Sequence, residues 1–273
     1  MPVFDHHDLF RRHAAEGVLL LGGGAAILLQ LADPRVAAGV ARHSGFHDRP
    51  LDRLIGTLDY VYAVGFGDEA TAKAAVRAVN ARHAAVRGSG GSEPAYSAFD
   101  PDAQHWVAST LLAVALELEE RLWGPLDSRT ADAIVRGYAP LGGRLQADVS
   151  SWPHSRAEFD AWWRHRLTSL EVTDEARGVA RSLLSSSPAL PFGASLALPP
   201  VRLITAALLP AGLRQAYGFR STPRAARVAD AWLRSIAVLW PRLPRSIRHA
   251  PMHASLRRAK RLSRYAEHDL QGR

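Results

Sequence analysis

Apolar residues recur along this chain at intervals of three and four positions, which is the period of an amphipathic helix. The clearest case begins at Asp100 and Pro101, where a capping carboxylate and a proline at the first helical position precede an apolar stripe that ends at Gly124. Stretches that alternate apolar and polar residues, as half-buried strands do, are missing from the sequence. The pattern therefore predicts an all-α fold, a single-domain multi-helix bundle that spans residues 1–273.

Caps, prolines and glycines predict where the other helices begin and end. Asp68 is expected to cap a helix that runs to about Arg87 and stops at the glycine-rich loop 88–92. Residues 185–200, with four serines and four prolines, are expected to form a loop or lid. Further helices are predicted at residues 22–31, 50–64, 128–138, 155–170, 174–184, 200–209 and 223–239.

The composition limits the chemistry that the protein can carry. Because the chain has no cysteine, disulfides, thiolate haem ligation, iron–sulfur clusters and cysteine-rich zinc sites are excluded. A metal would have to be held by histidine, aspartate, glutamate or a cofactor. Residues 5–8 carry two aspartates and two histidines where a secretory signal would be basic and then apolar. The longest apolar stretch, residues 18–32, is interrupted by glycines and too short to span a bilayer. We expect a soluble, cytoplasmic protein without a transmembrane span.

Charge is unevenly distributed along the chain. The net charge is +8, and residues 201–273 hold fifteen Arg or Lys against three acids. Residues 245–273 therefore form a basic C-terminal tail, but this tail lacks interleaved aromatic residues and any nucleic-acid motif. We interpret it as a solvated basic helix and expect no nucleic-acid partner. Glu117, Glu119, Glu120 and Arg121 are likewise expected to form a solvated ion-pair face.

One histidine falls in a helical apolar series. His83 occupies a place left open by residues 72, 76, 79 and 86, which predicts that it faces the core. A core histidine usually does no more than pack and hydrogen-bond to a neighbour. The functional alternative is an iron ligand, because a neutral imidazole in an apolar pocket can coordinate a haem. His105, beside Trp106 on the long helix, is the reserve candidate for the same role.

A cation and a hydroxyl are predicted to share one helix face. Arg53 and Thr57 are four residues apart, next to an apolar stripe. A buried guanidinium needs an acceptor, because an unpaired buried charge is very costly. That acceptor could be a nearby acid such as Asp52 or Asp59. Alternatively, Arg53 and Thr57 could donate hydrogen bonds to dioxygen, on which negative charge develops as it reacts.

Several strings of residues, in this order, resemble the rubber-oxygenase catalytic domain family. They include GAAILLQLADP, RLIGT and VNARHAAVRG, and weaker similarity continues to about residue 244, so the resemblance covers most of the chain. The matching strings lie at residues 24–34, 36–40, 43–44, 53–57, 66–68, 79–88, 96–101 and 106–111.

The resemblance implies a haem enzyme. The family includes the bacterial latex clearing protein and a fungal enzyme that shortens a prenyl side chain, both of which act on isoprenoid double bonds. In the latex clearing protein one histidine binds a b-type haem, within an arginine-x-x-x-threonine plus histidine signature that matches Arg53, Thr57 and His83. This implies a helical bundle that encloses a haem b pocket, with His83 as the metal ligand, Arg53 and Thr57 as catalytic residues and Arg87 beside the haem propionates. The implied activity is that of an oxygenase or peroxidase-like oxidoreductase, which uses dioxygen or peroxide on a hydrophobic small molecule.

The sequence also departs from the family pattern. The latex clearing protein has a lysine just before the signature threonine, where this chain has Gly56, so we expect a more open face above the iron. Related sequences often have histidine in place of Asp33 and Ala108, and we find no clear equivalent of the acidic base of the latex enzyme. Polymer cleavage is therefore not implied. The alternative from another functional class is a non-catalytic carrier or sensor that binds haem or lipid.

Overall fold

The computed structural model describes residues 6–43, 50–89, 95–184, 198–220 and 222–271, and the side chains of residues 6, 50–53 and 265–271 are outside this description. The predicted lid at 185–200 falls almost wholly outside the described residues. The helices and strands are α1 (His6–Ala14), η1 (Gly17–Gly22), α2 (Gly23–Leu31), α3 (Pro34–His43), α4 (Pro50–Phe66), α5 (Glu69–His83), β1 (Arg87–Gly88), β2 (Tyr96–Ser97), α6 (Pro101–Trp123), α7 (Ser128–Gly143), η2 (Val149–Ser151), α8 (Arg156–Leu167), α9 (Asp174–Leu183), α10 (Leu198–Leu208), α11 (Ala211–Ala216), α12 (Pro223–Leu239), η4 (Trp240–Arg242), α13 (Arg245–Arg248) and α14 (Ala250–Gln271).

The all-α prediction is confirmed. The strands that the described residues form are a two-residue antiparallel pair, in which Arg87 lies opposite Ser97 and Gly88 opposite Tyr96. The sequence did not predict this hairpin. Its strands are too short to show the alternation that identifies a strand.

Side-chain caps explain why the helices begin where they do. The Asp100 carboxylate accepts hydrogen bonds from the backbone N–H groups of Asp102 and Ala103, and α6 ends at Gly124, whose φ of 87° suits glycine. Asp68 caps α5 by accepting from the Thr71 N–H at 2.8 Å. That helix ends at His83, earlier than predicted, because the chain then turns into β1.

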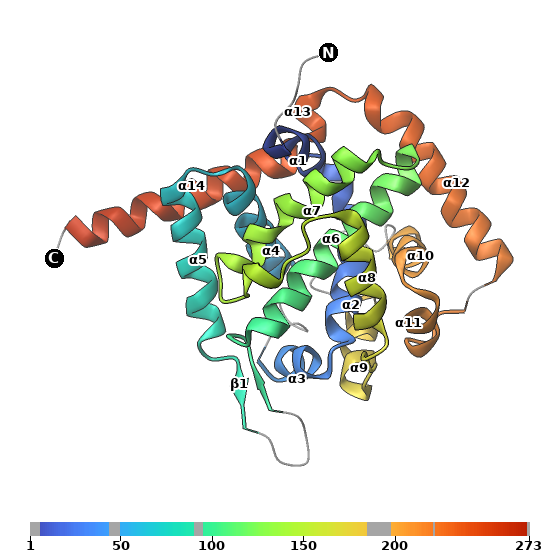
Figure 1. Ribbon diagram of the computed structural model, residues 1–273, viewed down its shortest axis with the longest axis horizontal. Coiled ribbons are helices and arrows are strands. Elements are labelled where there is room, and N and C mark those ends of the chain that lie inside the picture. The colour runs from blue at the N-terminus through green and yellow to red at the C-terminus, as the bar shows by residue number, and fades with distance from the viewer. Residues whose placement is uncertain (1–5, 44–49, 90–94, 185–197, 221, 272–273) are drawn as a thin grey trace.

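Helix α6 occupies the centre of the molecule (Figure 1). A first cluster of buried apolar side chains joins α6 to α2, α9 and α10, and Leu28 and Leu118 are fully buried in it. A second cluster joins it to α1, α7 and α8, with Leu112 and Val135 fully buried. On one side of the molecule α14 packs against α4 and α5, and the Arg258 guanidinium bonds the Asp59 carboxylate at 2.7 Å.

The prediction of a solvated ion-pair face on α6 is wrong for Glu119. Arg121 bonds Glu117 at 2.6 Å on the surface, as expected for residues four apart. Glu119, however, is only 2% exposed, and its Oε2 lies 2.9 Å from Nδ1 of His13 on α1. Helix α1 covers this side of α6, which the sequence pattern did not reveal.

In the described part of the chain, one bent pair of helices has the length and composition of a membrane span with a break in it. No single helix there is both long and apolar enough to cross a bilayer. This pair consists of His7–Ala14 and Gly17–Leu31, which are bent by 66° relative to each other, and it fits a membrane span by length and composition alone.

Candidate functional site

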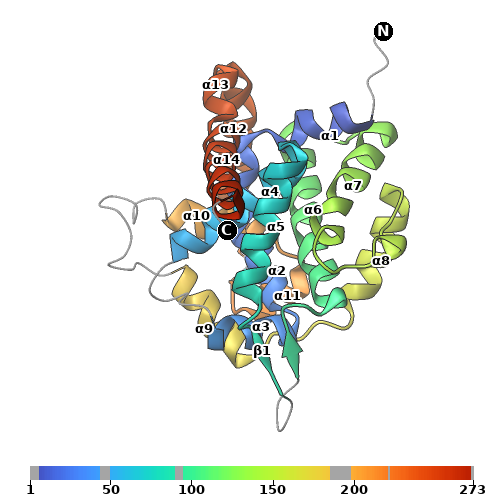
Figure 2. The same ribbon diagram turned by 90° about the vertical axis from the view of Figure 1, so that its left-hand side faces the viewer.

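Helices α4 and α5 are joined by a two-residue turn and pack against each other (Figure 2). At the end of the pair far from the turn, Gly56 on α4 faces Arg82 on α5. A Cβ added to Gly56 would lie closer than 3.0 Å to Nη1 of Arg82, so the guanidinium rests directly against the glycine. Since Thr57 and His83 are the next residues along their helices, this contact places them at the same end of the helix pair.

His83 is the last residue of α5 and is half-buried. Its ring meets that of Phe99 edge-on, with centroids 6.3 Å apart and planes at 77°. The predicted core-facing orientation is therefore only partly realised, because the helix ends here at the margin of the core. The Nδ1 atom of His83 is itself buried.

The two residues predicted to act opposite His83 lie on the first turns of α4. Arg53 is on the described backbone, one turn before Thr57, but its side chain falls outside the description. Thr57 is exposed, whereas the sequence placed it beside a buried stripe. Asp59, a proposed partner for Arg53, binds Arg258 of α14. Arg87, the predicted propionate partner, is exposed on β1, four residues after His83.

The space beside Gly56 is occupied by another side chain, while the expected more open face above the iron stays a prediction. The Arg82 side chain reaches across from α5 and fills the space that a side chain on Gly56 would take. Sequence reasoning did not single out Arg82. The available signal was the short turn at residues 67–68, which makes α4 and α5 neighbouring antiparallel helices.

Aromatic side chains from other elements border this end of α5. Tyr96 of β2 is 7% exposed, and its hydroxyl lies 2.8 Å from Nε2 of His43 on α3. Gly39 of α3 allows the hairpin to approach, since a Cβ there would meet Val86 at 3.2 Å and the Tyr96 ring at 3.5 Å. An imidazole bordered by apolar and aromatic groups suits a haem that is held by a single histidine. In the described ranges no three His, Cys, Asp or Glu side chains gather as a metal site.

His105, the reserve ligand, lies in a different environment. It is 6% exposed, and its ring packs against those of Trp152 and Trp162, with centroids 5.0 and 4.9 Å away. Burial lowers the pKa of its imidazole, and the charge of Arg166 acts in the same direction. Since the ring is buried and packs against two indoles, the geometry favours a packed core residue over a haem ligand.

A network of ion pairs surrounds Asp33, which lies between α2 and α3. Asp33 is 2% exposed and accepts from Nη2 of Arg35 at 2.9 Å and from Nη2 of Arg166 at 2.5 Å. Arg35 also bonds Asp100 at 3.0 Å and Asp102 at 2.6 Å, both on or beside α6. Burial alone would raise the pKa of the Asp33 carboxyl, but the bonds and charges of the two arginines outweigh it and lower that pKa. Asp33 thus fastens α2, α3, α6 and α8 together.

Comparisons with known proteins identify the relatives of this chain. The model of the family described as "ER-bound oxygenase mpaB/B'/Rubber oxygenase, catalytic domain" matches residues 10–238. An uncharacterized protein of Mycobacterium bovis and one of Mycobacterium tuberculosis are each 34% identical to the chain over 164 residues. Each match covers 57% of this chain and 64% of the relative's length, which is less than two thirds of it. No solved structure matches the chain.

Proposed function

Because this chain belongs to the family of ER-bound oxygenase mpaB/B' and rubber oxygenase catalytic domains, we propose that it is a haem b-dependent oxygenase acting on a hydrophobic small molecule. In this proposal His83 would bind the iron of the haem. Arg53 and Thr57 would donate hydrogen bonds to dioxygen or peroxide, and Arg87 would pair with the propionates.

The observation that carries the proposal is the contact between Gly56 and Arg82. It brings together two parts of the family signature that are 26 residues apart in sequence, Thr57 on α4 and His83 on α5. It also adds a second cation, Arg82, to the one that the signature supplies. A cluster of hydrogen-bond donors at one end of a helix pair is the arrangement that stabilises developing negative charge.

The side chains have distinct tasks in this proposal. When bound, the haem supplies the activation of dioxygen or peroxide. The Arg82 guanidinium would act through its positive charge and its N–H donors. The Thr57 hydroxyl both donates and accepts hydrogen bonds, so it can hold a proton next to the reacting oxygen. Phe99, whose ring meets the imidazole edge-on, would cover part of His83.

The visible spectrum of the full chain, purified after expression with haem supply, tests the proposal. We expect a stoichiometric Soret band in the wild type, in His105→Ala and in the control His154→Ala, whose side chain is exposed. The band should be lost in His83→Ala while far-UV circular dichroism remains helical. A band lost only in His105→Ala would move the site. No band in any of these proteins after haem reconstitution would refute haem dependence.

Oxygen uptake separates an enzyme from a carrier or sensor. With an electron donor and a candidate alkene or phenol, the wild type should consume oxygen faster than the same concentration of free haem, and Arg82→Ala should be slower with its Soret band retained. Haem binding without faster uptake for any substrate would favour the non-catalytic alternative.

A further inference from the structure

Helix α12 turns an apolar face away from the protein. Its inner side buries Ala229 and Leu233, at 1% and 2% exposure, where the helix packs on α6 and α10. Its outer side carries Trp232, Val238 and Leu239, which are 49%, 55% and 61% exposed. Figure 1 shows α12 at the outside of the molecule. Helical periodicity places these three side chains, with Val228 and Ser235, on one stripe.

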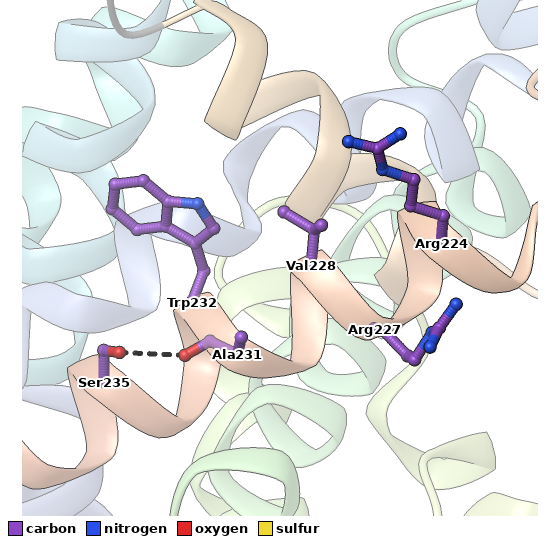
Figure 3. Close-up of a pocket in the computed structure, with 6 residues that line it drawn as sticks. All are labelled: Arg224, Arg227, Val228, Ala231, Trp232 and Ser235. Carbon is purple, nitrogen blue, oxygen red and sulfur yellow. Dashed lines mark hydrogen bonds between the residues drawn. The ribbon is translucent and has the colours of Figure 1, made fainter.

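The stripe has few polar groups that would interrupt it. The one hydroxyl within it, that of Ser235, donates to the Ala231 carbonyl at 2.9 Å and is satisfied on its own helix (Figure 3). A shallow hollow of about 560 Å³ lies over this part of the helix, and Trp232 and Val228 project on the same side of it. Soluble monomers rarely expose a continuous apolar face of this kind unless it contacts something.

Arginines surround the apolar stripe. Residues 223–248 contain six arginines and one acid, Asp230, which lies 3.7 Å from Arg121. Arg224 lies in line with the stripe at one end of the helix, and helical periodicity places Arg227 and Arg234 along one edge. In the part of the chain that the structure describes, none of these three has a carboxylate partner. The surface therefore pairs an apolar strip with unneutralised positive charge.

This combination indicates what covers the face. A helix with tryptophan and aliphatic residues on one side and arginines beside them lies in the plane of a membrane interface, and anionic headgroups attract the arginines. A second copy of this chain fits less well, because a symmetric contact would bring the arginines of both faces together without carboxylates to neutralise them.

We propose that the outer face of α12 docks on the surface of an anionic lipid bilayer. Trp232, Val238 and Leu239 enter the boundary between headgroups and acyl chains, and Arg224, Arg227 and Arg234 contact the lipid phosphates. Docking of this kind lies parallel to the membrane and needs no spanning segment. It does not depend on whether the protein binds haem.

The absence of native cysteine makes a site-specific test straightforward, because a single introduced cysteine carries the only label. Leu239→Cys and Val149→Cys are matched, since both native side chains are exposed, at 61% and 52%, and Val149 lies away from α12 on η2. Each protein receives an environment-sensitive fluorophore and is mixed with vesicles of phosphatidylcholine alone or of phosphatidylcholine with phosphatidylglycerol. Lipids with a nitroxide on the acyl chain then report depth by quenching.

The proposal predicts a blue shift and strong quenching for the label at 239, little change at 149, and binding that needs the anionic lipid. Replacing any one of Arg224, Arg227 and Arg234 by glutamine should weaken vesicle binding about fivefold. The substitution Trp232→Ser should weaken it about tenfold. The control Arg164→Gln, on the exposed side of α8, should bind like the wild type. No binding to anionic vesicles, or binding in which the label at 239 stays in water, would overturn the proposal. So would light scattering that shows a dimer lost in Trp232→Ser, since that result would assign the face to a second copy.

Discussion

Replacing Asp33 by asparagine is expected to remove a large part of the stability of this protein. The substitution keeps the shape of the side chain, and the remaining Oδ1 can still accept from the Arg35 N–H at 2.9 Å, which starts α3. It removes the negative charge that two guanidinium groups share. It also turns an N–H donor toward Arg166, whose Nη2 lies 2.5 Å from Oδ2 of Asp33.

The size of the effect follows from the burial of the three groups. Breaking a buried ion pair by removing one partner costs about 3–5 kcal/mol, because the other charge is left without compensation. Here the side chains of Arg35 and Arg166 are 28% and 17% exposed, and Arg35 keeps Asp100 and Asp102 as partners. We therefore expect a loss of about 2–3 kcal/mol in the free energy of unfolding, somewhat below the fully buried case.

Urea unfolding at pH 7, followed by circular dichroism, measures this loss. The matched control is Asp174→Asn, because Asp174 also bonds an arginine, Arg177 at 2.6 Å, but its side chain is 95% exposed. The control should lose no more than about 1 kcal/mol, as exposed pairs do. Equal losses of unfolding free energy in the two variants would refute the conclusion that the buried charge of Asp33 stabilises the fold.

The pH dependence gives a second check on the same residue. The folded pKa of Asp33 is lower than its unfolded value, so the carboxylate stabilises the fold above the unfolded pKa of about 3.9. That contribution is lost as the pH falls through the folded pKa. The difference in stability between wild type and Asp33→Asn should therefore be largest near neutrality and shrink below about pH 4. A difference that stayed constant into acid would mean that charge is not its source.

Three glycines give further predictions. Gly137→Ala on α7 should destabilise the protein by about 1–3 kcal/mol in urea unfolding, because its Cβ would lie within 3.0 Å of the buried Phe10 ring. Gly178→Ala on α9 meets nothing within 4 Å, so it should instead gain about 0.5–1 kcal/mol, and a gain in both variants would contradict the packing of α1 on α7. Gly56→Ala should keep or slightly raise the melting temperature, because only the mobile end of Arg82 must move, yet oxygen uptake by the haem-loaded protein should fall. Unchanged uptake would remove Arg82 from the site.

Local signals explain which parts of the fold could be predicted. Asp68 and Asp100 start helices through side-chain caps that involve neighbouring residues, and α12 begins at Pro223 and ends at Leu239 as predicted. Burial and partner choice depend on distant segments. The burial of Glu119 needs α1 to lie over α6, and the Asp33 partner Arg166 is 133 residues away. The hydrophobic pattern along the chain cannot predict either of these contacts.

The same distinction between local signals and distant contacts applies to the candidate site. Arg53, Thr57 and His83 came from the family signature, and their roles stay predictions. Arg82 carries no signal of its own in the sequence, because it is an exposed arginine in a chain rich in arginine. Its importance depends on the register of α4 against α5 and on the missing side chain at Gly56. Thr57 was placed beside a buried stripe and is exposed, since a four-residue spacing fixes a shared face but not which face is covered.

The packing of α14 on α4 and α5 couples the end of the chain to the candidate site. The family match ends at residue 238, so this helix lies beyond the segment that the family shares. Separating α4 from α5 would also cost the contacts of α14, including the bond between Arg258 and Asp59. Anything that binds α14 in its packed position therefore also stabilises the helix pair that carries the candidate site. The last helix of the chain thus contributes to the stability of the site from outside the segment that the family model matches.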